Sequence, residues 1–176
     1  MVNRLVKSVL VIVVGSVIVA SSEANAQVAQ RPPETLSLSG PRVGVTFLSD
    51  DVRATLRDDA HTDVGFAISQ FGWQKEKRFL SSPDGFTGVT EFVLLFGGLD
   101  QGVVLPSFNW LIGARTAKGI EFAAGPNLTP AGLAVAIAGG VTFQTGNLNI
   151  PVNFAVVPSK SGARISMLVG FNGRRR

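Results

Sequence analysis

The sequence contains no cysteine and no tyrosine, and His61 is its single histidine. The absence of cysteine excludes disulfide bonds, thiolate metal sites and cysteine catalysis. One histidine cannot by itself supply the several convergent groups that a catalytic site requires. We therefore expect a protein that is not an enzyme, with no catalytic residues, no metal site and no cofactor.

Charged residues are also scarce. They make up 16% of the chain and hydrophobic residues 45%, whereas soluble domains typically contain about 25% charged residues. The net charge is +4, but the basic residues are scattered apart from a run at 174–176, and no groove-reading helix accompanies them, so we expect no nucleic-acid partner. The aspartates between 50 and 63 lack the alternating spacing of a calcium loop, so we expect a solvated polar helix there.

The first 26 residues have the pattern of a secretory signal peptide. Arg4 and Lys7 form a positive start, and residues 9–20 form an apolar run (VLVIVVGSVIVA) that is short for a membrane span. The small residues of Ala24-Asn25-Ala26 suit a cleavage site, so we expect cleavage after Ala26. The alternative is an uncleaved N-terminal anchor.

The mature chain divides into a flexible start, a region of short strands and a basic tail. Residues 27–41 are polar and contain two adjacent prolines that block regular structure, and residues 173–176 form the tail. In the region 42–172, turn-forming residues separate segments rich in β-formers, which predict strands near 42–48, 66–79, 88–97, 103–115, 119–127, 132–144, 147–157 and 163–172. Short connections favour antiparallel neighbours. The longer connection 49–63 begins with Ser and Asp, which can cap a short helix.

Period-two alternation gives these segments one large apolar face and one small face. In the sixth, Val135 and Ile137 alternate with Ala136 and Ala138. The small face lacks the charged residues that a soluble barrel shows to water, but it suits the narrow interior of an eight-stranded barrel. The apolar face then meets lipid. The sequence therefore predicts an all-β fold, an eight-stranded antiparallel up-and-down β-barrel that spans a membrane.

The predicted inner face contains four charged residues. They are Glu91, Arg115, Glu121 and Arg164. Because buried charges need partners, we expect these residues to form a charge network across the lumen that fixes the packing of the interior. Eight phenylalanines are expected in two aromatic belts, with Phe47, Phe66, Phe96 and Phe154 near the outer end and Phe79, Phe122, Phe143 and Phe171 near the periplasmic end.

In this pattern the chain resembles the small eight-stranded outer-membrane β-barrels of Gram-negative bacteria. The likeness is clearest in the last predicted strand, where Ile165, Met167, Val169 and Phe171 alternate and end on an aromatic, like the C-terminal signal that marks such barrels for insertion. The resemblance implies a location in the cell outer membrane and a monomer. It also implies membrane lipid and the outer-membrane insertion machinery as partners. The residues after Phe171 and the short outward loops depart from the family pattern.

Two lysines and a proline do not fit a regular lipid-facing wall. Lys75 and Lys77 share a face with Trp73, and a charge on the lipid face costs about 2–4 kcal/mol at mid-bilayer. The second strand must therefore leave the bilayer near Gln74 or contain a bulge. Pro151 removes a ladder hydrogen bond from the seventh strand.

The sequence leaves two functions open. The first is a small non-conducting outer-membrane barrel with a structural or surface role. The alternative is a periplasmic lipocalin-like barrel that binds an apolar ligand. That barrel would turn Phe and Val inward and leave Lys75 and Lys77 in water.

Overall fold

The computed structural model describes residues 38–160 and 162–173. Its elements are β1 Gly40–Leu48, α2 Asp50–Ala60, β2 Ala67–Ser81, β3 Thr87–Gly97, the 3-10 helix η2 Leu99–Gln101, β4 Leu105–Arg115, β5 Ile120–Thr129, β6 Gly132–Thr145, β7 Leu148–Ser159, β8 Gly162–Gly170 and β9 Asn172–Gly173. The predicted signal peptide, its cleavage site, most of the predicted flexible start and residues 174–176 lie outside the described residues. The first strand begins at Gly40, two residues before its predicted start.

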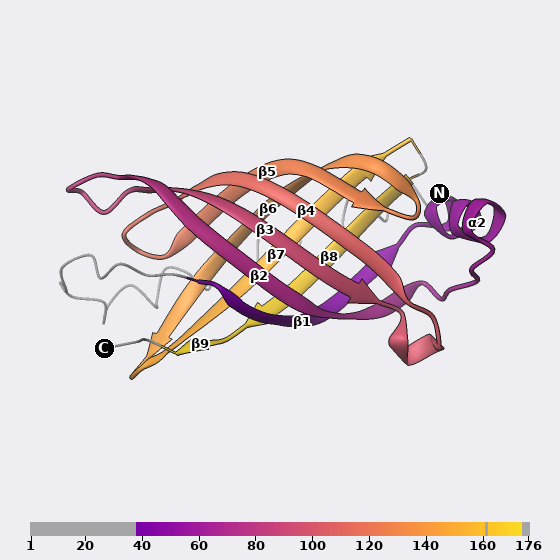
Figure 1. Cartoon of the computed structure of the whole chain (residues 1–176), viewed down its shortest axis with the longest axis horizontal. Coiled ribbons are helices and arrows are strands. Elements are labelled where there is room, and N and C mark those ends of the chain that lie inside the picture. Colours follow the sequence, from indigo (N-terminus) through magenta and orange to yellow (C-terminus); the bar gives the residue numbers. More distant parts are fainter. Residues whose placement is uncertain (1–37, 161, 174–176) are drawn as a thin grey trace, which may run out of the picture. The chain divides into compact units, whose positions relative to one another are not determined.

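The strands form one closed antiparallel barrel (Figure 1). Each strand pairs with its neighbours in the chain, β8 pairs with β1, and β9 continues β8 along β7 in the same register. Closure leaves no unpaired sheet edge and requires the strands to tilt around the barrel axis. The predicted eight-stranded up-and-down barrel is therefore confirmed, and it is the architecture that the resemblance to small outer-membrane barrels implies.

The pleat of each strand separates lumen from exterior. Along β4, Ser107 and Asn109 are buried, whereas Phe108, Trp110 and Ile112 are exposed. The same alternation continues around the barrel, and large apolar residues cover the outside. Polar and small residues line the lumen together with several buried aliphatic side chains, among them Leu95, Leu111 and Leu168. This direction agrees with the transmembrane interpretation. A lipocalin-like carrier requires Phe and Val inside; every phenylalanine lies exposed or half-buried, although Val93 and Val157 face the lumen. On the placement of the phenylalanines the alternative is wrong.

The helix α2 covers one mouth of the barrel, and we call this the α2 end (Figure 1). Ser49 is the N-cap and accepts a hydrogen bond from the backbone N–H of Val52 at 3.5 Å, as the predicted capping role requires. His61 is the C-cap in the left-handed conformation, with φ of 49°. Val52 and Leu56 face the barrel and pack with Leu48, Ile68 and Leu105 in one buried apolar cluster. No helix in the described part of the chain has the length and hydrophobicity needed to cross a membrane.

The β2–β3 ladder contains the predicted irregularity, but not at the lysines. The register shifts between Arg78 and Leu80, which is one residue pair beyond Lys77. Lys75 and Lys77 therefore keep the regular alternation and lie exposed on the outer face with Trp73. A bulge does not remove them from the wall.

Pro151 of β7 lies beside the break that separates β8 from β9. The β7–β8 ladder ends at the pair Val152 and Val169, and the β7–β9 ladder resumes at Asn149 and Asn172. Pro151 has no N–H to donate, so a ladder hydrogen bond is missing in this gap. The predicted cost of Pro151 thus appears as the interruption between β8 and β9.

Candidate functional site in the barrel lumen

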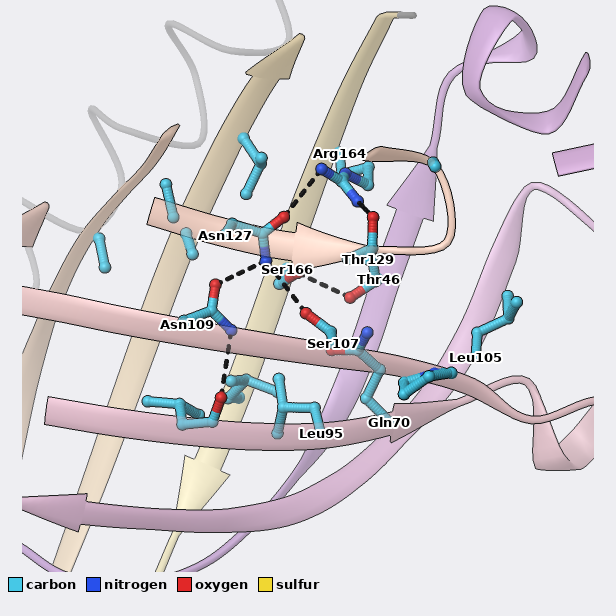
Figure 2. A pocket seen from close by; sticks show the side chains of 18 of the residues that line it. Thr46, Gln70, Leu95, Leu105, Ser107, Asn109, Asn127, Thr129, Arg164 and Ser166 are labelled. Atoms are coloured by element: carbon cyan, nitrogen blue, oxygen red, sulfur yellow. Dashed lines mark hydrogen bonds between the residues drawn. The ribbon is translucent and has the colours of Figure 1, made fainter. Parts of the chain in front are cut away.

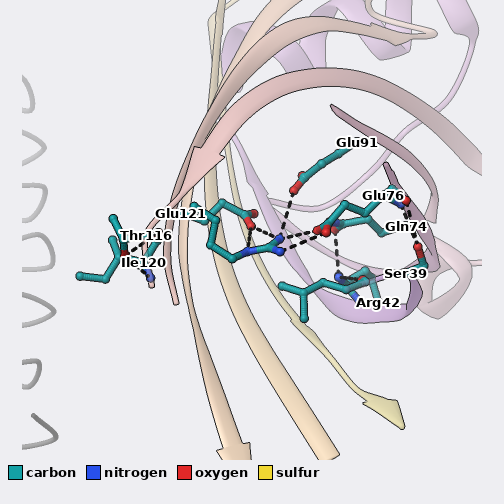
Figure 3. A network of polar contacts seen from close by, with 10 residues as sticks. Ser39, Arg42, Gln74, Glu76, Glu91, Thr116, Ile120 and Glu121 are labelled. Atoms are coloured by element: carbon teal, nitrogen blue, oxygen red, sulfur yellow. Dashed lines mark hydrogen bonds and ion pairs between the residues drawn. The ribbon is translucent and has the colours of Figure 1, made fainter. Parts of the chain in front are cut away.

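The lumen contains a charge cluster at the end opposite α2, and Figure 3 shows its contacts. Arg115, the last residue of β4, donates from Nε to the Oε2 atom of Glu121 at 2.7 Å and from Nη1 to the Oε1 atom of Glu76 at 3.0 Å. Its Nη2 also donates to both carboxylates. Glu91 Oε1 lies 4.0 Å from the same Nη2 atom. We use the name charge cluster for these four residues, all of which are buried.

A second guanidinium lies beside the charge cluster without an ion pair of its own among the described contacts. Arg42 is 1% exposed. It donates to Gln74 Oε1 at 3.0 Å and to the backbone oxygens of Pro41 at 3.0 Å and Leu38 at 2.7 Å. Each of the three guanidinium nitrogens thus donates to a neutral acceptor, and such hydrogen bonds are a condition for burying this group. Three carboxylates and two guanidiniums thus share this end of the lumen.

The structure brings together three of the four predicted network residues. Glu91, Arg115 and Glu121 meet, but Arg164 lies near the α2 end, where it donates to Asn127 Oδ1 at 2.8 Å and to the Thr129 hydroxyl. The sequence reasoning missed Glu76 and Arg42. Alternation along β2 could have identified Glu76, because it stands between two outward-facing lysines. Arg42 was missed because it stands at the predicted start of the first strand.

An amide network crosses the middle of the lumen (Figure 2). Asn127 Nδ2 donates to Ser107 Oγ at 3.0 Å and to Asn109 Oδ1 at 2.7 Å, and its Oδ1 accepts from Arg164. Asn109 donates in turn to the backbone oxygen of Val93 at 3.5 Å. The network therefore joins β8, β5, β4 and β3, and it restricts the open cross-section of the barrel.

A cavity of about 80 Å³ lies in the lumen between the charge cluster and α2. Its wall includes Val52 and Leu56 of the helix at one end and Glu91 at the other. Five buried polar atoms that form no hydrogen bond within the described chain belong to residues of this wall, and they are Gln70 Oε1, Gln74 Nε2, Glu91 Oε1, Asn153 Oδ1 and Arg164 Nε. The lining is mainly apolar, but these unpaired polar atoms give a space of this size partners for a few ordered water molecules.

The three carboxylates of the charge cluster are the described residues best placed to hold a metal ion. One oxygen each of Glu76, Glu91 and Glu121 lies within 4.8 Å of the others. However, the guanidinium of Arg115 already contacts these carboxylates and supplies the positive charge that a metal would bring. The geometry gives no reason to assign a metal to the cluster.

The polar groups of the connections at the α2 end are mostly exposed. Arg57 pairs with Asp63 at 3.0 Å on the surface of the first connection. In η2, Asp100 accepts hydrogen bonds from the hydroxyl and the backbone N–H of Ser69. The hydroxyl contact is the main cause that lowers the pKa of the Asp100 carboxyl, because hydrogen bonds to a carboxylate favour its charged form.

All eight belt phenylalanines lie on the outer face of the barrel or directly beside it. Phe47 and Phe66 form a ring pair at the α2 end with centroids 5.5 Å apart. Six of the eight are exposed, whereas Phe96 and Phe154 are half-buried. Phe154 lies near the middle of β7, so its position is not at a strand end.

Comparison with known proteins returns one weak structural likeness. No protein-family model matches the chain, and no curated protein sequence matches it. A solved structure of Ail, the attachment invasion locus protein of Yersinia pestis, in complex with the heparin analogue sucrose octasulfate, is similar over 77% of this chain and 96% of that chain. The identity is 11% and the TM-score is 0.27. At this level of similarity we base neither function nor partner on it.

Proposed function

We propose that the chain is a small, non-conducting outer-membrane β-barrel with a structural or surface role. The observation that carries this proposal is the apolar exterior. Leu133 is 72% exposed, Phe122 is 69% exposed and Trp73 is 58% exposed. A soluble monomer rarely exposes a contiguous apolar surface on this scale, whereas apolar residues outside and polar residues inside are the pattern of a membrane barrel.

The contents of the lumen support the absence of conduction. The charge cluster occupies one end, the network of Asn127 crosses the middle, and α2 covers the other mouth. An eight-stranded barrel has an interior that side chains can fill, while open channels need about 16 strands. In this proposal the buried charges stabilise the interior and form no ion pathway.

The proposal includes the route to the membrane. Residues 1–26 direct export and are removed after Ala26, and the alternating last strand that ends on Phe171 is recognised by the outer-membrane insertion machinery. The inserted protein is a monomer. In this proposal it has no catalytic activity and needs no cofactor, and His61 serves as a helix cap.

Fractionation tests the proposal. Membranes from a Gram-negative host that expresses the full chain are washed with carbonate or urea, and a soluble periplasmic protein serves as the control for release. We expect the barrel to remain in the outer-membrane pellet, because its apolar wall is held by lipid. Release together with the control would overturn the assignment.

A further inference from the structure

Three charged side chains are exposed among the strand residues that the structure describes, and all three belong to β2. Lys75 and Lys77 stand on alternate, outward-facing residues, and Arg78 follows them at the register shift near the end of the strand. The other outward-facing strand positions are uncharged, and none is acidic. The wall therefore carries a single concentrated positive charge on an otherwise apolar surface.

Cross-strand pairs place Lys75 within this surface. Lys75 lies directly opposite Phe92, which lies opposite Trp110. The rings of Phe92 and Trp110 stack with centroids 6.1 Å apart and planes 10° apart. Trp73 precedes Lys75 on the same face of β2. Trp73 is thus two residues from Lys75 on the same strand, and Trp110 is separated from the lysine by Phe92. We call Trp73, Phe92 and Trp110 the aromatic platform, which contains the two tryptophans of the chain.

Lys77 extends the same group toward the end opposite α2. It pairs with Thr90, whose hydroxyl accepts a hydrogen bond from Trp110 Nε1 at 3.0 Å. Because Thr90 satisfies the indole N–H, the tryptophan does not need a water partner at this position. The polar edge of the platform therefore consists of Lys77, Thr90 and the ammonium group of Lys75.

Two ammonium groups beside lipid chains need a counter-charge. A lysine on a membrane wall can extend its ammonium group along its apolar stem toward the headgroups. The ion pairs among the described residues do not involve Lys75 or Lys77, and the wall offers no carboxylate. The negative charge that suits this position is the phosphate of a lipid headgroup.

We propose that Lys75 and Lys77, with Trp73 and Trp110, form a binding site for the headgroup of an anionic phospholipid in the leaflet at the end opposite α2. The inference rests on the proposed membrane location. The lysines bind the phosphate, and the aromatic platform packs against the glycerol and the upper acyl chain. The acidic residues of α2 lie at the other mouth, so attraction of anionic lipid is favoured at the lysine end.

The two tryptophans make the site directly measurable. The protein is reconstituted into phosphatidylcholine vesicles that contain a fixed fraction of brominated phosphatidylglycerol or of brominated phosphatidylcholine, and quenching of tryptophan fluorescence gives the relative affinity of each lipid for this position. We expect about a fivefold preference for the anionic lipid, on the basis of the attraction of a lysine to an anionic surface.

Matched double variants separate a site from general electrostatics. The variant Lys75→Gln/Lys77→Gln should lose the preference. The variant Lys118→Gln/Lys160→Gln, which removes the same charge from two exposed turns, should keep it. If a variant fails to insert, the quenching of the wild-type protein by the two brominated lipids still tests the preference for anionic lipid.

The failures of the two proposals differ. Equal quenching by both brominated lipids in the wild type, or equal loss of preference in both double variants, would overturn the lipid site and leave the barrel in the membrane. The absence of quenching by either lipid would place the tryptophans outside lipid and overturn the proposed function itself.

Discussion

At the scale of single residues, the interior depends on how its charges are paired. Arg115 donates to Glu76 and Glu121 and lies 4.0 Å from Glu91. A buried ion pair often adds little net stability over apolar packing, but removing one partner leaves a buried charge without compensation. Arg115 is therefore the residue on which the charge cluster depends most.

Replacing Arg115 with Met should destabilise the barrel by about 3–5 kcal/mol, because three buried carboxylates then repel one another. The matched control is Arg57→Met, which removes the exposed pair with Asp63 and should cost about 0–1 kcal/mol. Unfolding in urea, followed by tryptophan fluorescence, measures both. Equal midpoints for the two variants would contradict a structural role for the cluster.

The pKa of Asp100 gives a second residue-scale prediction. The hydroxyl of Ser69 lowers the pKa of this carboxyl in the folded state. The ionised Asp100 carboxyl therefore stabilises the folded state at pH values above its pKa in the unfolded chain. This stabilisation is lost as the pH falls through the lower pKa that Asp100 has in the folded state. In Ser69→Ala the pKa of Asp100 should rise toward its ordinary value, as a carboxyl NMR titration would detect. The Ser159→Ala variant, whose hydroxyl donates to the Gly162 oxygen instead, should leave it unchanged.

At the scale of elements, α2 is a lid whose position depends on two side chains. Val52 is 0% exposed and Leu56 is 4% exposed, whereas the rest of the helix is polar apart from Ala54 and Ala60. A helix of 11 residues is marginal in isolation, so its contact with Leu48 and Ile68 holds it in place.

The substitution Leu56→Ala should release α2 without unfolding the barrel. Loss of a buried leucine costs about 2–5 kcal/mol, and we expect this cost to appear as faster hydrogen exchange over 50–60. Asp58→Ala, on the exposed face of the same helix, should leave the exchange unchanged. Unaltered protection in Leu56→Ala would show that the helix does not depend on this contact.

Adjacent residues of β6 face different surroundings, because one side chain faces the outside of the barrel and the next faces the narrow lumen. Val135 is exposed, and Ala136 is 1% exposed. Val135→Arg should cost about 2–4 kcal/mol near the bilayer midplane. Ala136→Leu should cost about 1–3 kcal/mol by overfilling the lumen.

Ala163→Leu, at an exposed position near the start of β8, is the control and should be nearly neutral. Cysteine labelling provides an independent readout, since the chain has no cysteine. A cysteine at 136 should resist a water-soluble maleimide, and a fluorophore at 135 should be quenched by lipid-borne quenchers. Free labelling at 136 without quenching at 135 would contradict the orientation of the faces.

At the scale of the whole molecule, three separate obstructions lie along one barrel axis. The charge cluster, the amide network and α2 derive from strands and connections far apart in the sequence. Loss of one obstruction leaves the other two, so the closed state does not depend on a single contact.

Purified protein in planar bilayers should therefore show no steady conductance. The Leu56→Ala variant should behave in the same way, because releasing the lid leaves the cluster and the amide network in place. Stable channels of nanosiemens size in the wild type would require a wider lumen than eight strands enclose. They would contradict the non-conducting assignment.

The sequence by itself determined the strands, their faces and the helix start. The alternation of Val135, Ala136, Ile137 and Ala138 reports on the pleat, which is a local property with a period of two residues. Ser49 likewise determined the start of α2 through a contact within one turn. These features could be predicted because neighbouring residues alone decide them.

The tertiary structure decided which interior groups meet. Arg164 and Arg115 share the inner face, yet they lie at different levels of the barrel, because the stagger of the strand pairs sets the height of each side chain. Glu76 and Arg42 join or border the cluster for the same reason. Alternation within one strand shows that a residue faces the lumen. Its height along the barrel axis, and therefore its partners, depends on the register of all eight strand pairings together.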